Sequence, residues 1–115
     1  MALSRAQLSD VTVVSAGSTQ AIATVAGSNK VFVKSIMAHN TSGVTTTTAQ
    51  VYVVPNGGSV ATSNRLFNVT VEPDETIYIE PAYPITIETT GDTVQVGAGS
   101  NGGINFFVTG DQEGW

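Results

Sequence analysis

The most restrictive feature of this sequence is its surplus of residues that branch at the β carbon. Its 115 residues include 16 valines, 16 threonines and 7 isoleucines, but only 3 leucines. Branched side chains lose rotamer freedom in a helix, whereas they pack well on a pleated sheet. A chain of this length is long enough for one domain with a core of its own. The composition therefore predicts a single all-β domain.

Apolar and polar residues alternate in several short segments between residues 67 and 108, as in strands with one buried and one solvated face. Turn residues separate these segments at the spacing expected of β-sandwiches and barrels. We expect a single antiparallel β-sandwich, jelly-roll or immunoglobulin-like, with seven to nine short strands. The predicted core residues are Phe67, Val69, Val71, Ile77, Ile79, Ile85, Ile87, Val94, Val96, Phe106 and Val108.

Two further β-rich segments flank the turn residues 40–43. The segments comprise residues 31–39 and 47–54, and this order predicts a central antiparallel pair of strands. Residues 45–48 are too polar for a core, so we expect them to extend the pair as an exposed ribbon or loop.

The first of these two segments carries apolar residues at both odd- and even-numbered positions. Strict alternation puts Val31 and Val33 on one face together with Met37, and it puts Phe32, Ile36 and Ala38 on the other. A strand that is apolar on both faces is usually covered on both sides. One domain can cover only one of them, so this pattern predicts contact with another chain.

The two ends of the chain are poor in apolar periodicity. We expect residues 1–10 to form a loosely ordered arm, residues 11–109 the sandwich, and residues 110–115 a tail that ends on the only tryptophan. The arm is predicted to serve assembly and to contribute little to folding, because it buries too little apolar surface to offset its loss of entropy. The N-terminus lacks the apolar region of a secretory signal, which predicts synthesis in a cytoplasm.

The charge distribution limits the kinds of molecule that this chain is expected to bind. The formal net charge is −5, and the four Lys and Arg residues are scattered along the chain. Nucleic-acid backbones attract clustered basic residues, so no direct nucleic-acid contact is expected. No apolar stretch is long enough to span a membrane. Only 11% of the residues are charged, against about 25% in typical soluble domains, and this is expected of a protein that lives in an assembly.

No motif predicts catalysis. Residues 97–102 match the dinucleotide pattern GxGxxG, but a strand-like segment follows where the pyrophosphate would need a helix. His39 is the only histidine, and no nucleophile elbow accompanies it. A hairpin would set Glu80 and Glu88 face to face, as the carboxylates of a glycosidase are, yet both fall on polar strand faces. We expect no enzyme activity, no cofactor and no metal site.

The order of these signals resembles a known class of proteins. The segments that carry the resemblance are MALSRAQLSD, VKSIMAHNTSG, VYVVPNGGS, RLFNVTVEPDETIYIE and ITIETTGDTVQV. The resemblance covers residues 33–96. It is to small β-rich virion structural proteins of tailed bacteriophages, including those that infect cyanobacteria. It implies a particle component made in the host cytoplasm, either a capsid decoration (cement) protein or a neck, tail or fibre protein.

We therefore expect a non-enzymatic decoration protein that bridges capsid subunits. The expected partners are other copies of the chain, as a trimer or another homo-oligomer, and a major capsid or other virion protein. The alternative is a neck, tail or fibre component, or a receptor- or carbohydrate-binding sandwich module. The candidate interface residues are Leu3, Leu8, Phe32, Ile36, Tyr52 and Trp115.

Overall fold

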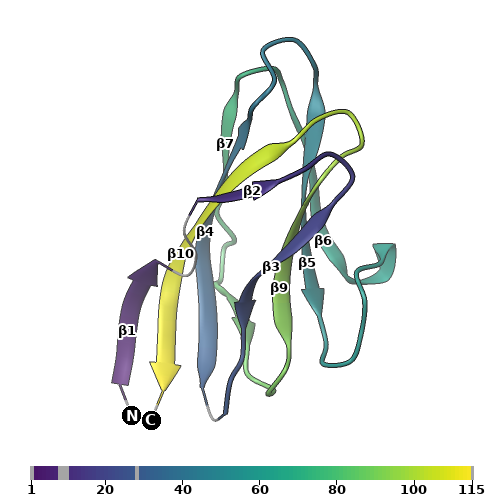
Figure 1. Ribbon diagram of the computed structural model, residues 1–115. Coiled ribbons are helices and arrows are strands. Elements are labelled where there is room, and N and C mark those ends of the chain that lie inside the picture. The colour runs from purple at the N-terminus through teal and green to yellow at the C-terminus, as the bar shows by residue number, and fades with distance from the viewer. Residues whose placement is uncertain (1, 8–10, 28, 115) are drawn as a thin grey trace.

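The computed structural model describes residues 2–7, 11–27 and 29–114, and the side chains of residues 11–27 and 29–113. The described residues form strands and one short 3₁₀ turn, η1 (Thr62–Asn64), and they contain no α-helix (Figure 1). The strands are β1 (Ala2–Gln7), β2 (Thr12–Val14), β3 (Thr19–Thr24), β4 (Lys30–Asn40), β5 (Thr47–Val54), β6 (Arg65–Val71), β7 (Thr76–Ile79), β8 (Ile85–Ile87), β9 (Thr93–Ala98) and β10 (Ile104–Gly114).

The strands form two antiparallel sheets that pack as a sandwich. Sheet A has the order β1-β10-β4-β7, with β2 also beside β10 and β8 also beside β4, and sheet B has the order β3-β9-β5-β6. The predicted all-β sandwich is confirmed. The described residues form ten strands, more than the seven to nine expected, and one of the ten lies in the predicted arm. The glycine-rich segment after β9 leads into strand β10 and not into a helix, as expected.

The predicted central pair is wrong, because its two strands belong to different sheets. β4 pairs with β10, β7 and β8, whereas β5 pairs with β6 and β9. Residues 41–46 therefore cross from one sheet to the other and do not close a hairpin. The predicted exposed ribbon is also shorter than expected, because β5 starts at Thr47 and that residue is buried.

Asn40 holds this crossing in place. It lies at the end of β4 with no exposed surface, and its Nδ2 donates to the carbonyl oxygens of Thr45 at 2.8 Å, Val71 at 3.1 Å and Glu72 at 3.2 Å. Its Oδ1 accepts from the backbone N–H of Ser42 at 2.9 Å. One side-chain amide thus satisfies backbone groups on both sides of the crossing, where a buried backbone group needs a partner.

A β-bulge in β4 explains why this strand carries apolar residues at both odd- and even-numbered positions. Ser35 pairs with Thr109 but Val33 pairs with Gly110, so Lys34 is an extra residue in β4. A bulge shifts the phase of alternation by one residue. Val33 and Ile36 are consequently both buried on the inner face, so the apolar residues at odd and even positions do not require that β4 be covered on both sides.

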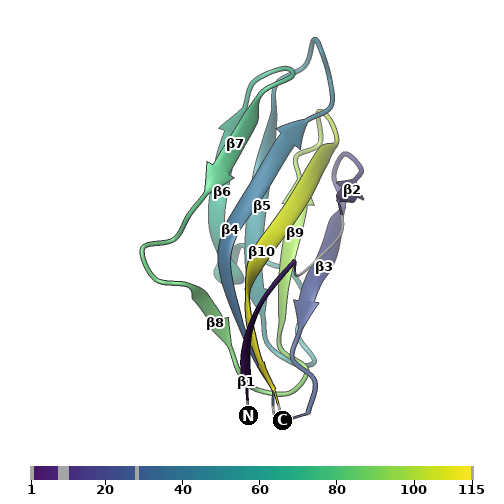
Figure 2. The same cartoon turned by 90° about the vertical axis from the view of Figure 1, so that its left-hand side faces the viewer.

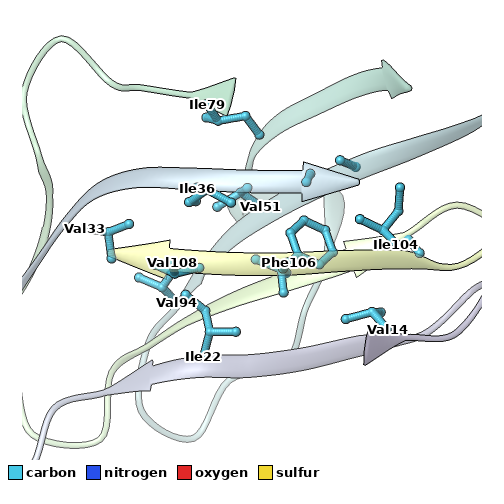
Figure 3. Close-up of a cluster of buried hydrophobic side chains, with 14 of the residues drawn as sticks. Val14, Ile22, Val33, Ile36, Val51, Ile79, Val94, Ile104, Phe106 and Val108 are labelled. Atoms are coloured by element: carbon cyan, nitrogen blue, oxygen red, sulfur yellow. The ribbon is translucent and has the colours of Figure 1, made fainter. Parts of the chain in front are cut away.

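The core lies between the two sheets. Figure 3 shows side chains from both sheets in one cluster, among them Val33, Ile36 and Phe106 of sheet A and Val51 and Val94 of sheet B. Of the predicted core residues, seven are buried, and the other four pack against the cluster while partly exposed, namely Phe67, Val69, Ile77 and Ile85. All of them therefore belong to the core or its border.

The ends of the chain differ from their prediction. β1 pairs along its whole length with residues 109–114 of β10, and β10 continues unbroken through the expected start of the tail at Gly110. An edge strand needs only backbone pairing to form, so the lack of apolar periodicity in residues 2–7 does not prevent it. The expected Trp115 tail end lies outside the described residues.

The β7 and β8 strands follow one another along the same edge of β4 (Figure 2). β7 pairs with residues 36–39 and β8 with residues 31–33, and the connection between them passes the bulge at Lys34. Glu80 and Glu88 follow these two strands, which do not pair with each other in the described structure. The hairpin that would have set these carboxylates face to face does not form.

Candidate interaction surface

The outer face of sheet A carries a line of large apolar side chains. Met37 of β4 is paired with Tyr78 of β7 on one side and with Phe107 of β10 on the other. Val11, just before β2, lines the same hollow as Met37 and Phe107. We call Val11, Met37, Tyr78 and Phe107 the apolar row. Val11 and Tyr78 are each 61% exposed, and Val13 of β2, opposite Asn105 of β10, is also exposed.

The pleat of each strand explains why these side chains face outward. Met37 lies between Ile36 and Ala38, and Phe107 lies between Phe106 and Val108, all four of which are buried. Since successive side chains point to opposite faces of a sheet, the residue between two core residues must point to solvent. The row therefore places large apolar side chains where an isolated sandwich would carry polar ones.

A hollow of about 260 Å³ lies at this row, and its polar edge centres on His39. His39 Nδ1 lies 2.8 Å from Thr76 Oγ1, and His39 Nε2 lies 3.4 Å from Asp74 Oδ1. Asn105 also lines the hollow, and its Oδ1 is buried without a hydrogen-bond partner among the described residues.

Hydroxyl, imidazole and carboxylate are the members of a hydrolytic triad, but their environment differs here. In such a triad the carboxylate is buried, where it orients the imidazole. The Asp74 side chain is 80% exposed, so it is fully hydrated and orients His39 weakly. Within the described part of the chain, no group of three or more His, Cys, Asp or Glu residues is placed to hold a metal ion. The chemistry of this surface is that of an apolar contact with a polar border.

The structure places the predicted interface residues in several different environments. Ile36 is fully buried and Tyr52 is only 7% exposed. The prediction that these two side chains are available for an interface is therefore wrong. Phe32 is half-buried in sheet A, where it pairs with Thr86 and Asp111. Leu3 lies in β1, and its side chain is not among those that the structure describes. Leu8 and Trp115 lie outside the described residues.

Tyr52 lies on the outer face of sheet B, within a layer of polar side chains. Its hydroxyl donates to Gln50 Oε1 at 2.9 Å, and Gln50 Nε2 donates to Asn68 Oδ1 at 3.3 Å. The first bond lies within β5 and occupies the polar atom of the ring, and the second connects β5 with β6. Sheet B thus presents a largely polar outer face, in contrast to sheet A.

A second hollow, of about 340 Å³, is polar and lies near the start of β5 and the β9–β10 turn. Its lining consists of Thr46, Thr47, Thr48, Thr70, Gly99, Ser100 and Asn101. No aromatic residue is among them, whereas small-molecule sites are usually lined by apolar and aromatic side chains. This hollow supplies hydroxyl groups but no flat ring on which a sugar would stack.

Sequence reasoning missed the apolar row, although a signal for part of it was present. Tyr78 and Phe107 occupy the solvent-facing positions of strands whose core residues were correctly identified. A large apolar side chain in a solvent-facing position marks an exposed apolar surface. Met37 gave no such signal, because the bulge at Lys34 put it on the opposite face from the one that strict alternation predicts.

No protein-family model and no curated protein sequence matches this chain. Its fold is similar to that of part of a chain from the crystal structure of the T13 IBDV viral particle, with a TM-score of 0.59 and 11% identity over 96% of this chain and 30% of that chain. A chain of the infectious bursal disease virus VP2 subviral particle gives a TM-score of 0.48, with 10% identity over 96% of this chain and 32% of that one.

The chain thus spans about 30% of the length of the T13 particle chain that it matches. At 11% identity, this likeness establishes a shared fold. Among the described residues, no helix has the length and apolarity needed to cross a membrane. The molecule is an antiparallel β-sandwich of a kind also found in a viral particle.

Proposed function

We propose that this protein is a non-enzymatic structural component of a virus particle, present in multiple copies and bound to the capsid as a decoration protein. Its partners are a capsid protein and other copies of itself. The sequence resemblance to proteins of tailed phages supports the phage particle as its location. Its mechanism is adhesion: it bridges neighbouring capsid subunits and stabilises them without turnover.

The apolar row is the observation that carries this proposal. A contiguous apolar patch on the surface of a soluble protein, bordered by polar residues, often marks an interaction site. Here Met37, Tyr78 and Phe107 form one cross-strand line on three neighbouring strands, with Val11 beside them. Covering one such side chain completely contributes about 1.5–3 kcal/mol. A capsid surface that covers the row would therefore bind this face in preference to the polar face of sheet B.

Two further features support an assembled state. The likeness to part of a chain of a viral particle supports a place for this type of sandwich in a particle. Charged residues make up only 11% of the chain, and they are absent from the apolar row itself. Because a decoration protein binds only the assembled shell, its contribution to particle stability follows from mass action and is lost on dissociation.

The direct experiment compares particles with and without this protein. Particles that lack it should lose integrity at a lower temperature and after a milder osmotic shock, and adding the purified protein should restore both. Unchanged resistance to heat and osmotic shock, together with normal binding to host cells, would contradict a decoration role.

A matched pair of variants tests the contact surface. Tyr78→Lys places a charge in the apolar row and should weaken binding to stripped particles by at least about tenfold, because the covered ring surface is lost. Tyr83→Lys makes the same change at a residue that is 86% exposed and outside the row, and it should bind normally. Normal binding by Tyr78→Lys would locate the contact elsewhere, and equal loss in both variants would mean that the added charge acts without regard to the row.

A receptor- or carbohydrate-binding module in the neck, tail or fibre is the second candidate. The polar hollow at Thr46–Thr48 and the exposed ring of Tyr83 favour it. In that case particles without the protein would be as robust as complete ones but would fail to attach to host cells. Tyr83→Lys would then be the damaging variant, and Tyr78→Lys would be the control.

A further inference from the structure

Sheet B has two edge strands, β3 and β6, and β6 is the longer of the two. It is the last strand in the order β3-β9-β5-β6, and among the described residues it pairs only with β5. An edge strand presents free N–H and C=O groups, which proteins usually shield by keeping the strand short or by adding Pro or Lys. β6 has seven residues and contains neither Pro nor Lys, whereas β7 and β8 at the corresponding edge of sheet A have four and three.

The core-facing side chains of β6 are incompletely covered. Val71 is fully buried, but Phe67 and Val69 on the same face are only partly buried and pack at the border of the core. A further strand beside β6 would cover the exposed parts of these two side chains. Its backbone would also satisfy the free hydrogen-bonding groups of the edge.

The pairing of β6 with β5 defines which part of the edge is regular. Val51 pairs with Phe67 and Tyr52 pairs with Arg65, so Leu66 is an extra, bulged residue. The regular part therefore runs from Phe67 to Val71, and its midpoint is Val69. A strand that is regular about a central residue can pair with an identical antiparallel strand about a two-fold axis.

In that arrangement Val69 lies opposite Val69 of the second copy. Phe67 lies opposite Val71 and, because Leu66 is bulged, Arg65 lies opposite Glu72. Arg65 and Glu72 have opposite charges and have no ion pair with any described residue. Glu72 Oε2 accepts only a hydroxyl hydrogen bond, from Thr46 at 3.1 Å. The two-fold axis would thus create two Arg–Glu pairs at once, one at each end of the contact.

We propose that two copies of this chain pair through β6, edge to edge and antiparallel, and join their B sheets into one continuous sheet. The occupant of the edge is a second copy because the same strand supplies both the apolar centre and both charges. This goes beyond the proposed function and does not depend on it, since it concerns a contact between isolated copies. Among the homo-oligomers expected from the sequence, a trimer or another, it specifies a two-fold dimer.

The oligomeric state of the purified full chain tests the contact. Sedimentation equilibrium over a range of concentrations should fit a monomer–dimer equilibrium. Arg65→Glu should weaken the dimer by about tenfold through two lost ion pairs, and the double variant Arg65→Glu with Glu72→Arg should restore it. Lys30→Glu changes the net charge equally on β4 and should leave the dimer intact. A monomer at all concentrations, a trimer, or no rescue by the double variant would overturn the proposal.

Cysteine cross-linking tests the register, because the chain contains no cysteine of its own. Pairing centred on Val69 puts Asn68 of one copy opposite Thr70 of the other, and directly opposite residues are close enough for a disulfide. Oxidation of a mixture of Asn68→Cys and Thr70→Cys chains should give a covalent heterodimer. Either variant alone should cross-link much less. Preferential cross-linking of one variant with itself would overturn this register.

Discussion

Val33 and Ile36 are three residues apart on one strand, yet both side chains are fully buried in the same core. In a regular strand, residues separated by three point to opposite faces. The extra residue Lys34 removes this difference, because Ser35 pairs with Thr109 while Val33 pairs with Gly110. The strand carries apolar residues at odd and even positions, and the bulge gives it a single core face and directs Met37 outward.

The first prediction tests this assignment of faces. Ile36→Ala should lower the free energy of unfolding by about 2–5 kcal/mol, because it removes buried methyl groups and leaves a cavity. Met37→Ala should cost less, since Met37 is 37% exposed and lies outside the buried core. Urea unfolding of both variants measures the difference. A larger cost for Met37→Ala would mean that strict alternation holds along β4.

The contrast between β4 and the later strands explains how far sequence reasoning reached. From Phe67 to Val108 the alternation is regular enough that each predicted core residue is found in or against the core. In β4 a local backbone irregularity, invisible in composition, reversed the assignment. The crossing after Asn40 was also missed, because the same turn residues serve a hairpin and a passage between sheets. Which of the two forms depends on the strands that pair later in the chain.

The second prediction concerns the ion pair that accompanies the bulge. Lys34 Nζ lies 2.6 Å from Asp111 Oδ2, and the Asp111 side chain is only 7% exposed. Lys34→Met should destabilise the fold by about 1–3 kcal/mol, because it leaves a nearly buried carboxylate without its cation. Lys30→Met removes a lysine whose pair with Glu88 is exposed, and it should cost less than about 1 kcal/mol. Thermal unfolding of the two variants should separate them clearly.

The third prediction concerns Asn40. Asn40→Ala should destabilise the protein by about 3 kcal/mol, because the carbonyl oxygens of Val71 and Thr45 and the N–H of Ser42 lose their partner at a buried crossing. Asn101→Ala, an exposed asparagine in the β9–β10 turn, is the matched control and should be nearly neutral. Chemical denaturation measures the free energy of unfolding of both variants. An equally small loss in the two would contradict the prediction, and it would mean that water takes over the hydrogen bonds of the Asn40 side chain.

The apolar row shows why the interaction surface was less predictable than the fold. A core is encoded by many repeated apolar positions, so single errors are averaged out. A surface contact depends on a few positions, and its geometry arises only when β7, β4 and β10 are set side by side. Tyr78 and Phe107 are 29 residues apart in the sequence, and nothing local connects them. Their common neighbour Met37 becomes recognisable only from the register of all three strands.

The last prediction concerns β1, which was expected to be dispensable for folding. Its six residues pair with residues 109–114 of β10, and they cover an edge that would otherwise expose free backbone groups. Removing residues 2–7 should therefore lower the melting temperature, with a loss of about 1–3 kcal/mol, since an edge strand contributes few net hydrogen bonds and its own ordering costs entropy. Amide hydrogen exchange should speed up within residues 109–113, which lose β1 as their partner on one side and keep only β4. Exchange should stay slow at Phe106, which β2 and β4 continue to pair on both sides. An unchanged melting temperature with unchanged exchange would mean that β1 is an assembly arm after all, because its pairing would then add nothing to the isolated fold.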